Sequence, residues 1–242
     1  IADHAPLNVT DHAHSQIATW ADIPQKYYQK MQQASPALLA GNVNHWLHHH
    51  EKPVSRMIRT LDGKARAFLS NRYRRIDNEH IAAAILPILI EAKDVRIESA
   101  EVTEKNLYIK AVFARLEGEV KKGDLVQAGL VIKNSEIGSG ALEVAPMVYR
   151  LVCTNGMIAD ASGDYSLNKT HIGRVVSGDA ANYELYRDET MQADDHALLL
   201  KLQDVVRGAA SDKIFQLLLA NMRMATQGPR ILHPVPAVEV LG

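Results

Sequence analysis

The densest positive charge in the sequence lies between Lys52 and Arg75. This segment holds eight Lys or Arg residues and one acid, Asp62, although the whole chain has a formal net charge of -1. Guanidinium and ammonium groups neutralise phosphates, and aromatic rings stack on bases, so cations interleaved with aromatics are typical of a nucleic-acid surface. The candidate contacts in this segment are Arg56, Arg59, Lys64, Arg66, Phe68, Arg72, Tyr73, Arg74 and Arg75. The alternative is a solvated face of an ordinary hairpin.

A second cationic motif occurs further along the chain. His171 and Arg174 flank Gly173, whose free backbone lets both side chains reach one anion, and Lys169 precedes them. The alternative is a loop anchor in which His171 is bonded to the backbone. These residues lie in a segment rich in Gly, Ser, Asn and Asp, 154–182, which we expect to be a mobile loop that closes over an anionic strand.

Two more cations are candidate contacts on predicted strands, Lys133 and Arg150. Arg150 lies in an apolar stretch, where an unpaired charge would be costly. It must therefore pair with an acid, for which Glu143 and Glu136 are the candidates, or face a ligand groove.

Catalytic and metal-binding patterns are weaker. His45 and His49 have the i, i+4 spacing that can grip a metal on a helix, but exposed imidazoles at a helix C-terminus also interact favourably with the helix dipole. The sequence has no phosphate-binding loop and no nucleophile elbow. We therefore expect no cofactor and no resident metal, and favour a non-catalytic protein while leaving an enzyme open.

Composition limits the protein class. The 242 residues are 47% hydrophobic and 5% aromatic, enough for a core built mainly from aliphatic side chains. A single cysteine excludes an intramolecular disulfide framework and is typical of a reducing cytoplasm. No apolar run reaches the roughly 20 residues that span a bilayer, and the start of the sequence resembles no signal peptide. We expect a cytoplasmic protein without a membrane partner that is a processed or partial form of a longer chain.

Hydrophobic periodicity predicts an α+β fold. N-terminal helices, a central antiparallel sheet in hairpin–helix–meander order, and C-terminal helices should follow one another. Thr10 or Asp11 is expected to cap the first helix, and Asp62-Gly63 to form the hairpin turn. The remaining predicted elements are a helix at 78–92, strands at 94–101, 106–114, 125–134 and 141–153, and a helix at 189–222. The predicted regions are 1–55 (N-terminal, helical), 56–176 (central, α+β) and 177–242 (C-terminal, helical, on the same core).

Several longer motifs carry a resemblance to a known family. They include Asn42-Val43-Asn44-His45-Trp46-Leu47, Gly123-Asp124-Leu125-Val126-Gln127-Ala128-Gly129 and Tyr149-Arg150-Leu151-Val152-Cys153-Thr154-Asn155-Gly156-Met157. In these motifs the chain resembles the phage/plasmid-like family of bacterial proteins, which has no assigned reaction. The resemblance implies a setting of mobile DNA. The order of the central elements is also similar to that of phage single-strand annealing recombinases.

These observations predict a nucleic-acid-binding protein of a mobile genetic element. It would hold single-stranded DNA along the basic segment and promote strand annealing and recombination as a homo-oligomer. One alternative is a metal-dependent enzyme on nucleic acid, with ligands from His45 and His49 or from acids near Asp160 and Asp164. Another is a protein-interaction module that modulates a host system through the acidic residues Asp188, Glu189, Asp194 and Asp195.

Overall fold

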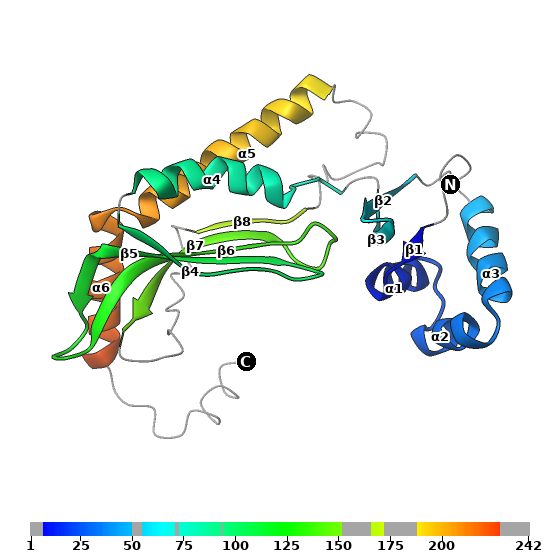
Figure 1. Cartoon of the computed structure of the whole chain (residues 1–242), viewed down its shortest axis with the longest axis horizontal. Coiled ribbons are helices and arrows are strands. Elements are labelled where there is room, and N and C mark those ends of the chain that lie inside the picture. Colours follow the sequence, from blue (N-terminus) through cyan, green and yellow to red (C-terminus); the bar gives the residue numbers. More distant parts are fainter. Residues whose placement is uncertain are drawn as a thin grey trace.

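The computed structural model describes residues 7–49, 55–70, 73–92, 94–151, 166–171 and 188–227. Two groups of elements are joined by the segment around residues 73–77 (Figure 1). The N-terminal group contains β1 (Asn8–Val9), α1 (Asp11–Trp20), α2 (Gln25–Ala34), α3 (Pro36–His48), β2 (Arg56–Leu61) and β3 (Lys64–Ser70). The second group contains α4 (Asn78–Glu91), β4 (Val95–Val102), β5 (Leu107–Glu119), β6 (Leu125–Asn134), β7 (Leu142–Arg150), β8 (Leu167–Lys169), α5 (Asp188–Ala209) and α6 (Asp212–Gln227). The α+β class is confirmed.

The basic segment forms the predicted hairpin. β2 and β3 pair antiparallel, and the turn residues Asp62 and Gly63 both have positive φ, 50° and 71°. This conformation suits an Asp-Gly turn, since glycine adopts it without steric cost. β3 also pairs in parallel with β1, so the hairpin belongs to one small sheet with the N-terminal strand. The boundary expected after residue 55 therefore falls between elements that share a sheet.

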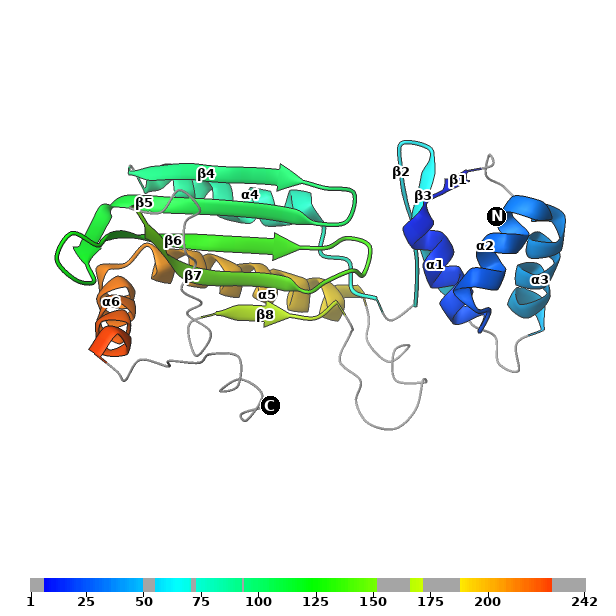
Figure 2. The ribbon, with the colours of Figure 1, turned by 90° about the horizontal axis from the view of Figure 1, so that it is seen from below.

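A five-stranded antiparallel sheet in the order β4-β5-β6-β7-β8 forms the centre of the second group. Figures 1 and 2 show α4 and α5 along one face of this sheet and α6 at one end. On β6 the predicted alternation is confirmed, because Val126, Ala128, Leu130 and Ile132 all enter the main core beneath the helices. The opposite face has its own buried cluster of Val112, Val131, Ala145 and Met147. None of the helices in the described part of the chain has the length and apolarity that a bilayer span requires.

Two predictions about the C-terminal half need correction. The helix expected at 189–222 is two helices, α5 and α6, because Ser211 interrupts it. The Ser211 hydroxyl donates to Gly208 O at 2.7 Å and accepts from Ile214 N at 3.4 Å, as a residue at a helix start does. Within the predicted 154–182 loop, residues 167–169 form β8 because they pair with the edge of β7. Residues 152–165 and 172–187 lie outside the described residues.

The N-terminal helices pack around a small separate core. The Thr10 side chain caps α1, as expected, by accepting from Ala13 N. Leu39 of α3 is buried in this core and Val43 packs against it, but Trp46 and Leu47 remain 48% and 41% exposed. In the sequence, Leu39, Val43, Trp46 and Leu47 have the i, i+4, i+7, i+8 spacing that predicts one buried helix face, but this face is buried only in the first half of α3.

The turn between β6 and β7, residues 135–140, joins the two groups. Ile137 is buried with Ala67, Leu69 and Tyr73. The Ile137 carbonyl oxygen accepts from Gln16 Nε2 at 2.9 Å. This small apolar contact and the polar bonds around it position the hairpin relative to the large sheet.

A substitution at Gly138 tests the contribution of this contact to stability. Its φ is 78°, and an added Cβ would lie 2.8 Å from Leu69 Cδ2. We expect Gly138→Ala to lower the free energy of unfolding by about 1 to 3 kcal/mol, because it adds both backbone strain and a clash. Gly140→Ala is the matched control, since a Cβ added there would meet Asn106 Oδ1 no closer than 3.7 Å, and it should cost less than about 0.5 kcal/mol. Urea denaturation measures both, and equal effects would contradict the expectation.

Candidate nucleic-acid interface

Carboxylates outside the hairpin neutralise two of its arginines. Arg59 pairs with Asp77 at 2.5 Å, and Arg66 pairs with Glu136 at 3.2 Å. All four side chains are largely buried, with 16% to 29% of their side-chain surface exposed. Partial burial strengthens such pairs relative to exposed ones. These guanidinium groups therefore hold the hairpin against the rest of the molecule.

Arg74 has the most buried charge among these cations. It is 7% exposed and contacts two carboxylates at the start of α5, Asp194 at 2.6 Å and Asp195 at 2.5 Å. A buried guanidinium requires such partners because the cost of removing it from water is large. Two of the four acids that suggested a docking face for a basic partner thus hold a buried arginine of the same chain.

Tyr73 and His171 form a stacked pair beside Arg74. Their ring centroids are 5.0 Å apart with 4° between the planes, and the Tyr73 hydroxyl donates to Ser135 O at 2.9 Å. His171 Nδ1 lies 3.2 Å from Arg74 O, and Arg74 N donates to His171 O at 2.7 Å. Burial raises the pKa of Tyr73 and lowers the pKa of His171. His171 is thus bonded to the backbone, as in the anchor alternative.

The other predicted contacts are distributed over the molecule. Arg150 pairs with Asp124 at 2.8 Å, whereas the two acids expected as its partners pair elsewhere, Glu143 with Lys133 and Glu136 with Arg66, each at 3.2 Å. Lys64 and Arg75 are exposed and Lys169 is half-buried. Two predicted contacts, Arg72 and Arg174, lie outside the described residues.

Arg56 differs from the other arginines of the hairpin. Its guanidinium carbon lies 5.3 Å from the Trp20 ring centroid and 5.7 Å from that of Phe68, and the two rings are 5.4 Å apart. No ion pair joins it to a carboxylate of the described residues, and burial lowers its pKa. The group nevertheless stays protonated, since arginine does not lose its charge in proteins. We call Trp20, Arg56 and Phe68 the aromatic ledge.

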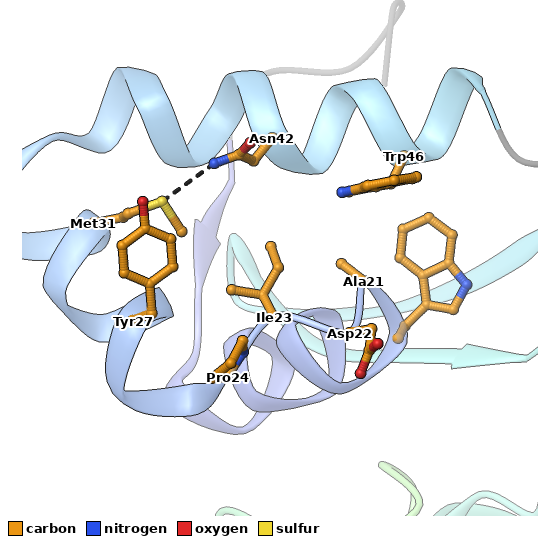
Figure 3. A pocket seen from close by; sticks show the side chains of 9 residues that line it. Ala21, Asp22, Ile23, Pro24, Tyr27, Met31, Asn42 and Trp46 are labelled. Atoms are coloured by element: carbon orange, nitrogen blue, oxygen red, sulfur yellow. Dashed lines mark hydrogen bonds between the residues drawn. The ribbon is translucent and has the colours of Figure 1, made fainter.

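A cavity adjoins this ledge. It encloses about 470 Å³ between the α1–α2 turn and α3, and Trp20 forms part of its wall. Tyr27, Met31, Asn42 and Trp46 also line it (Figure 3), and Asn42 Nδ2 contacts Met31 Sδ at 3.3 Å. Tyr27 and Trp46 are each about half exposed, at 49% and 48%. Flat aromatic walls and an amide suit a planar ligand with polar edges.

No motif in the sequence predicted this cavity, although one signal pointed to it. The chain has only two tryptophans, Trp20 and Trp46, and both line the cavity. Trp20 ends α1, and Asp22 follows it with a positive φ of 54°. That turn redirects the chain into α2 and opens space beside the indole.

The two histidines at the C-terminal end of α3 contact each other. The rings of His45 and His49 stack with centroids 4.4 Å apart, and His49 Nδ1 lies 2.9 Å from His45 O. Among the residues that the structure describes, no group of three or more His, Cys, Asp or Glu side chains is arranged to hold a metal ion. Asp160 and Asp164 lie outside that part of the chain.

Fold and site together define an α+β protein with an aromatic cavity in its N-terminal group, beside which Arg56 lies over the Trp20 ring. Residues 66–230 match the family described as Domain of unknown function (DUF932), and the chain belongs to that family, since the match covers more than half of its 242 residues. No curated protein and no solved structure matches the chain. The matched range includes the large sheet and Phe68, whereas Trp20, Trp46 and Arg56 precede it.

Two histidines with a lowered pKa, one buried and one half-buried, predict a pH dependence of stability. Burial lowers the pKa of His171 and of His14, whose Nδ1 lies 2.8 Å from Tyr28 Oη. Above the ordinary histidine pKa of about 6.5 both rings are neutral in the folded and unfolded states, so neither ring lowers the free energy of unfolding. As the pH falls below that value the unfolded chain takes up protons first, and the free energy of unfolding decreases.

We therefore expect stability to fall between about pH 7.5 and 5. The His171→Gln variant, which keeps a donor for Arg74 O, should be less stable than wild type at the upper pH and should lose less on acidification. Urea denaturation at both pH values measures the difference. An equal loss in the two proteins would show that His171 does not titrate as described.

Proposed function

We propose that this protein binds single-stranded nucleic acid, with single-stranded DNA as the preferred form, at the aromatic ledge and the adjoining cavity. The observation that supports the proposal is the position of Arg56. It carries a positive charge that no carboxylate of the described residues neutralises, and it lies over the Trp20 ring that also lines the cavity. A phosphate site and a base site are thus adjacent.

The chemistry of the two parts suits a nucleotide. Arg56 offers the N–H groups of its guanidinium to a phosphate, since its guanidinium carbon lies over Trp20 and Phe68 and its buried Nε has no hydrogen-bond partner among the described residues. The exposed faces of Tyr27 and Trp46 can stack on a base. The Asn42 amide oxygen and the Asp22 carboxylate, both in the cavity wall, accept hydrogen bonds from base amino groups.

The same geometry favours a single strand over a duplex. Bases in a duplex are stacked on one another, so their faces cannot enter an aromatic cavity unless they are first unstacked. A single strand presents them at lower cost. The exposed Lys64 and Arg75 and the half-buried Lys169 provide further positive charge for the backbone, and Arg72 and Arg174 remain predicted contacts.

The biological task that we propose is annealing of complementary strands during recombination of a mobile genetic element in the cytoplasm. The resemblance to phage/plasmid-like proteins and the hairpin–helix–meander order support this task. One cavity of about 470 Å³ holds few nucleotides, so annealing would require several protomers acting on one strand. A homo-oligomer is therefore part of the proposal.

The phosphate part of the site is tested with Arg56→Ala. Affinity for a labelled single-stranded oligonucleotide, measured by fluorescence anisotropy, should fall by about 1.5 to 3 kcal/mol, the usual loss for a hydrogen bond to a charged group. The dependence of log affinity on log salt should also flatten by about one phosphate contact. Lys213→Ala removes an exposed cation on α6 and should leave both quantities unchanged. Wild-type protein that does not bind would refute the proposal.

The base part of the site is tested with Trp46→Ala. Stacking on an aromatic side chain contributes about 1 to 3 kcal/mol per base, so affinity should fall by that amount while the salt dependence stays the same. Leu47→Ala is the matched control, because Leu47 is the neighbouring half-exposed residue of α3 and does not line the cavity. Strand binding should also quench wild-type tryptophan fluorescence. Equal affinity of the two variants would place the bases elsewhere.

A further inference from the structure

β4 is a long and exposed edge strand. It has eight residues and pairs only with β5 among the described strands, at one edge of the large sheet (Figure 2). Every residue after Val95 is exposed, including Ile97 at 46% and Val102 at 68%. Such an edge presents unpaired N–H and C=O groups that can accept another strand, and monomeric proteins usually protect these edges.

Two hydrogen bonds fix which backbone groups of β4 are free. Ala114 N donates to Asp94 O at 3.0 Å, and Thr103 N donates to Asn106 O at 2.8 Å, so Asp94 and Thr103 face β5. Hydrogen-bonding direction alternates along a strand. Since Asp94 and Thr103 face β5, the alternation from each end turns the backbone groups of every second residue away from β5. These residues are Val95 and Ile97 from one end, and Val102 and Ala100 from the other. The bulge between Ile97 and Ser99 provides the one interruption of the alternation.

These four residues are symmetric about the point between Glu98 and Ser99. In an antiparallel pair of two β4 strands centred there, Val95 of one copy is opposite Val102 of the other, and Ile97 is opposite Ala100. Each of these pairs has outward N–H and C=O groups on both strands, as a hydrogen-bonded pair requires. A two-fold axis through that point relates the copies, as in most homodimers.

The side chains fit the same register. Val95, Ile97, Ala100 and Val102 are paired with Phe113, Ala111, Ile109 and Leu107 of the main core, so they lie on the face that the helices cover. On that face each apolar residue would meet an apolar residue of the other copy. α4, which leads into β4, also has two exposed apolar residues, Leu86 at 45% and Ile90 at 77%.

The charges on the opposite face are also complementary. Arg96 is opposite Val112 and Glu101 is opposite Tyr108, so both lie on the face away from the helices. In the two-fold register Arg96 of one copy is directly opposite Glu101 of the other, and the symmetry makes this pair twice. Within one chain Arg96 contacts Glu98 at 2.8 Å and keeps 54% of its side chain exposed, so it remains accessible to a second partner.

We propose that β4 is a dimerisation edge, at which a second copy of this chain pairs antiparallel about an axis between Glu98 and Ser99. The two sheets then continue across the contact, and neither copy exposes its β4 edge. This surface lies on the large sheet and not in the nucleic-acid site, so the proposal goes beyond the proposed function and does not require it.

The test uses charge reversal in the full chain without nucleic acid. Sedimentation equilibrium should show a wild-type dimer, and Arg96→Glu and Glu101→Arg should each weaken dimerisation at least about tenfold, because each places like charges opposite one another. An equimolar mixture of the two variants should recover dimers, since every cross-chain pair in the heterodimer is then complementary. Lys122→Glu, an exposed reversal in the β5–β6 turn, is the matched control and should dimerise like wild type.

The mixture separates a lost contact from a lost fold, because two misfolded variants would not restore each other. Recovery of dimers in the mixture supports the β4 register. A wild-type chain that stays monomeric at about 100 μM would overturn the proposal. Single variants that dimerise as tightly as wild type, or a mixture that stays monomeric, would also overturn it. Open-ended oligomers would overturn it as well, since a two-fold edge contact closes at two copies.

Discussion

The buried charge of Arg74 constrains the whole arrangement of the molecule. A guanidinium that is 7% exposed cannot remain without carboxylates, and it receives Asp194 and Asp195 from α5, about 120 residues away in sequence. Its backbone N–H meanwhile bonds to His171, next to β8. Arg74, which lies in the connection between the two groups, therefore binds both a helix and the edge of the sheet. Removing one partner of such a buried pair typically costs about 3 to 5 kcal/mol.

The cations of the basic segment have different roles, which depend on whether a carboxylate pairs with them. Arg59, Arg66 and Arg74 are paired with acids that lie outside the basic segment, so their charge is used to hold the hairpin in place. Arg56 stacks on aromatic rings instead, and rings do not neutralise a charge. A cluster that looks uniform in sequence thus divides into three structural cations and others, among them Arg56, Lys64 and Arg75, that remain available to an anion. The structural cations also keep the aromatic ledge at a fixed place on the molecule.

Local signals in the sequence predicted the elements, and distant contacts decided the site. The Asp62-Gly63 turn, the Thr10 cap and the alternation along β6 each depend on neighbouring residues, which is why they were predicted. The partners Glu136, Asp194 and Asp195 lie 70 to 121 residues from the arginines that they bind. No spacing rule connects residues so far apart. The cavity was missed for the same reason, since Trp20 and Trp46 come together only when α3 packs beside the α1–α2 turn.

The bulge in β4 shows how one extra residue can give an edge a two-fold character. In a regular strand starting at Val95, the outward residues would be Val95, Ile97, Ser99 and Glu101, and Glu101 would lie on the helix face. The extra residue shifts the second half by one, which returns Ala100 and Val102 to the apolar face and to the free edge. The strand then has the same pattern from either end, with valines outermost and opposite charges next to them. A bulge that served only to twist the edge away from partners would have no need of that symmetry.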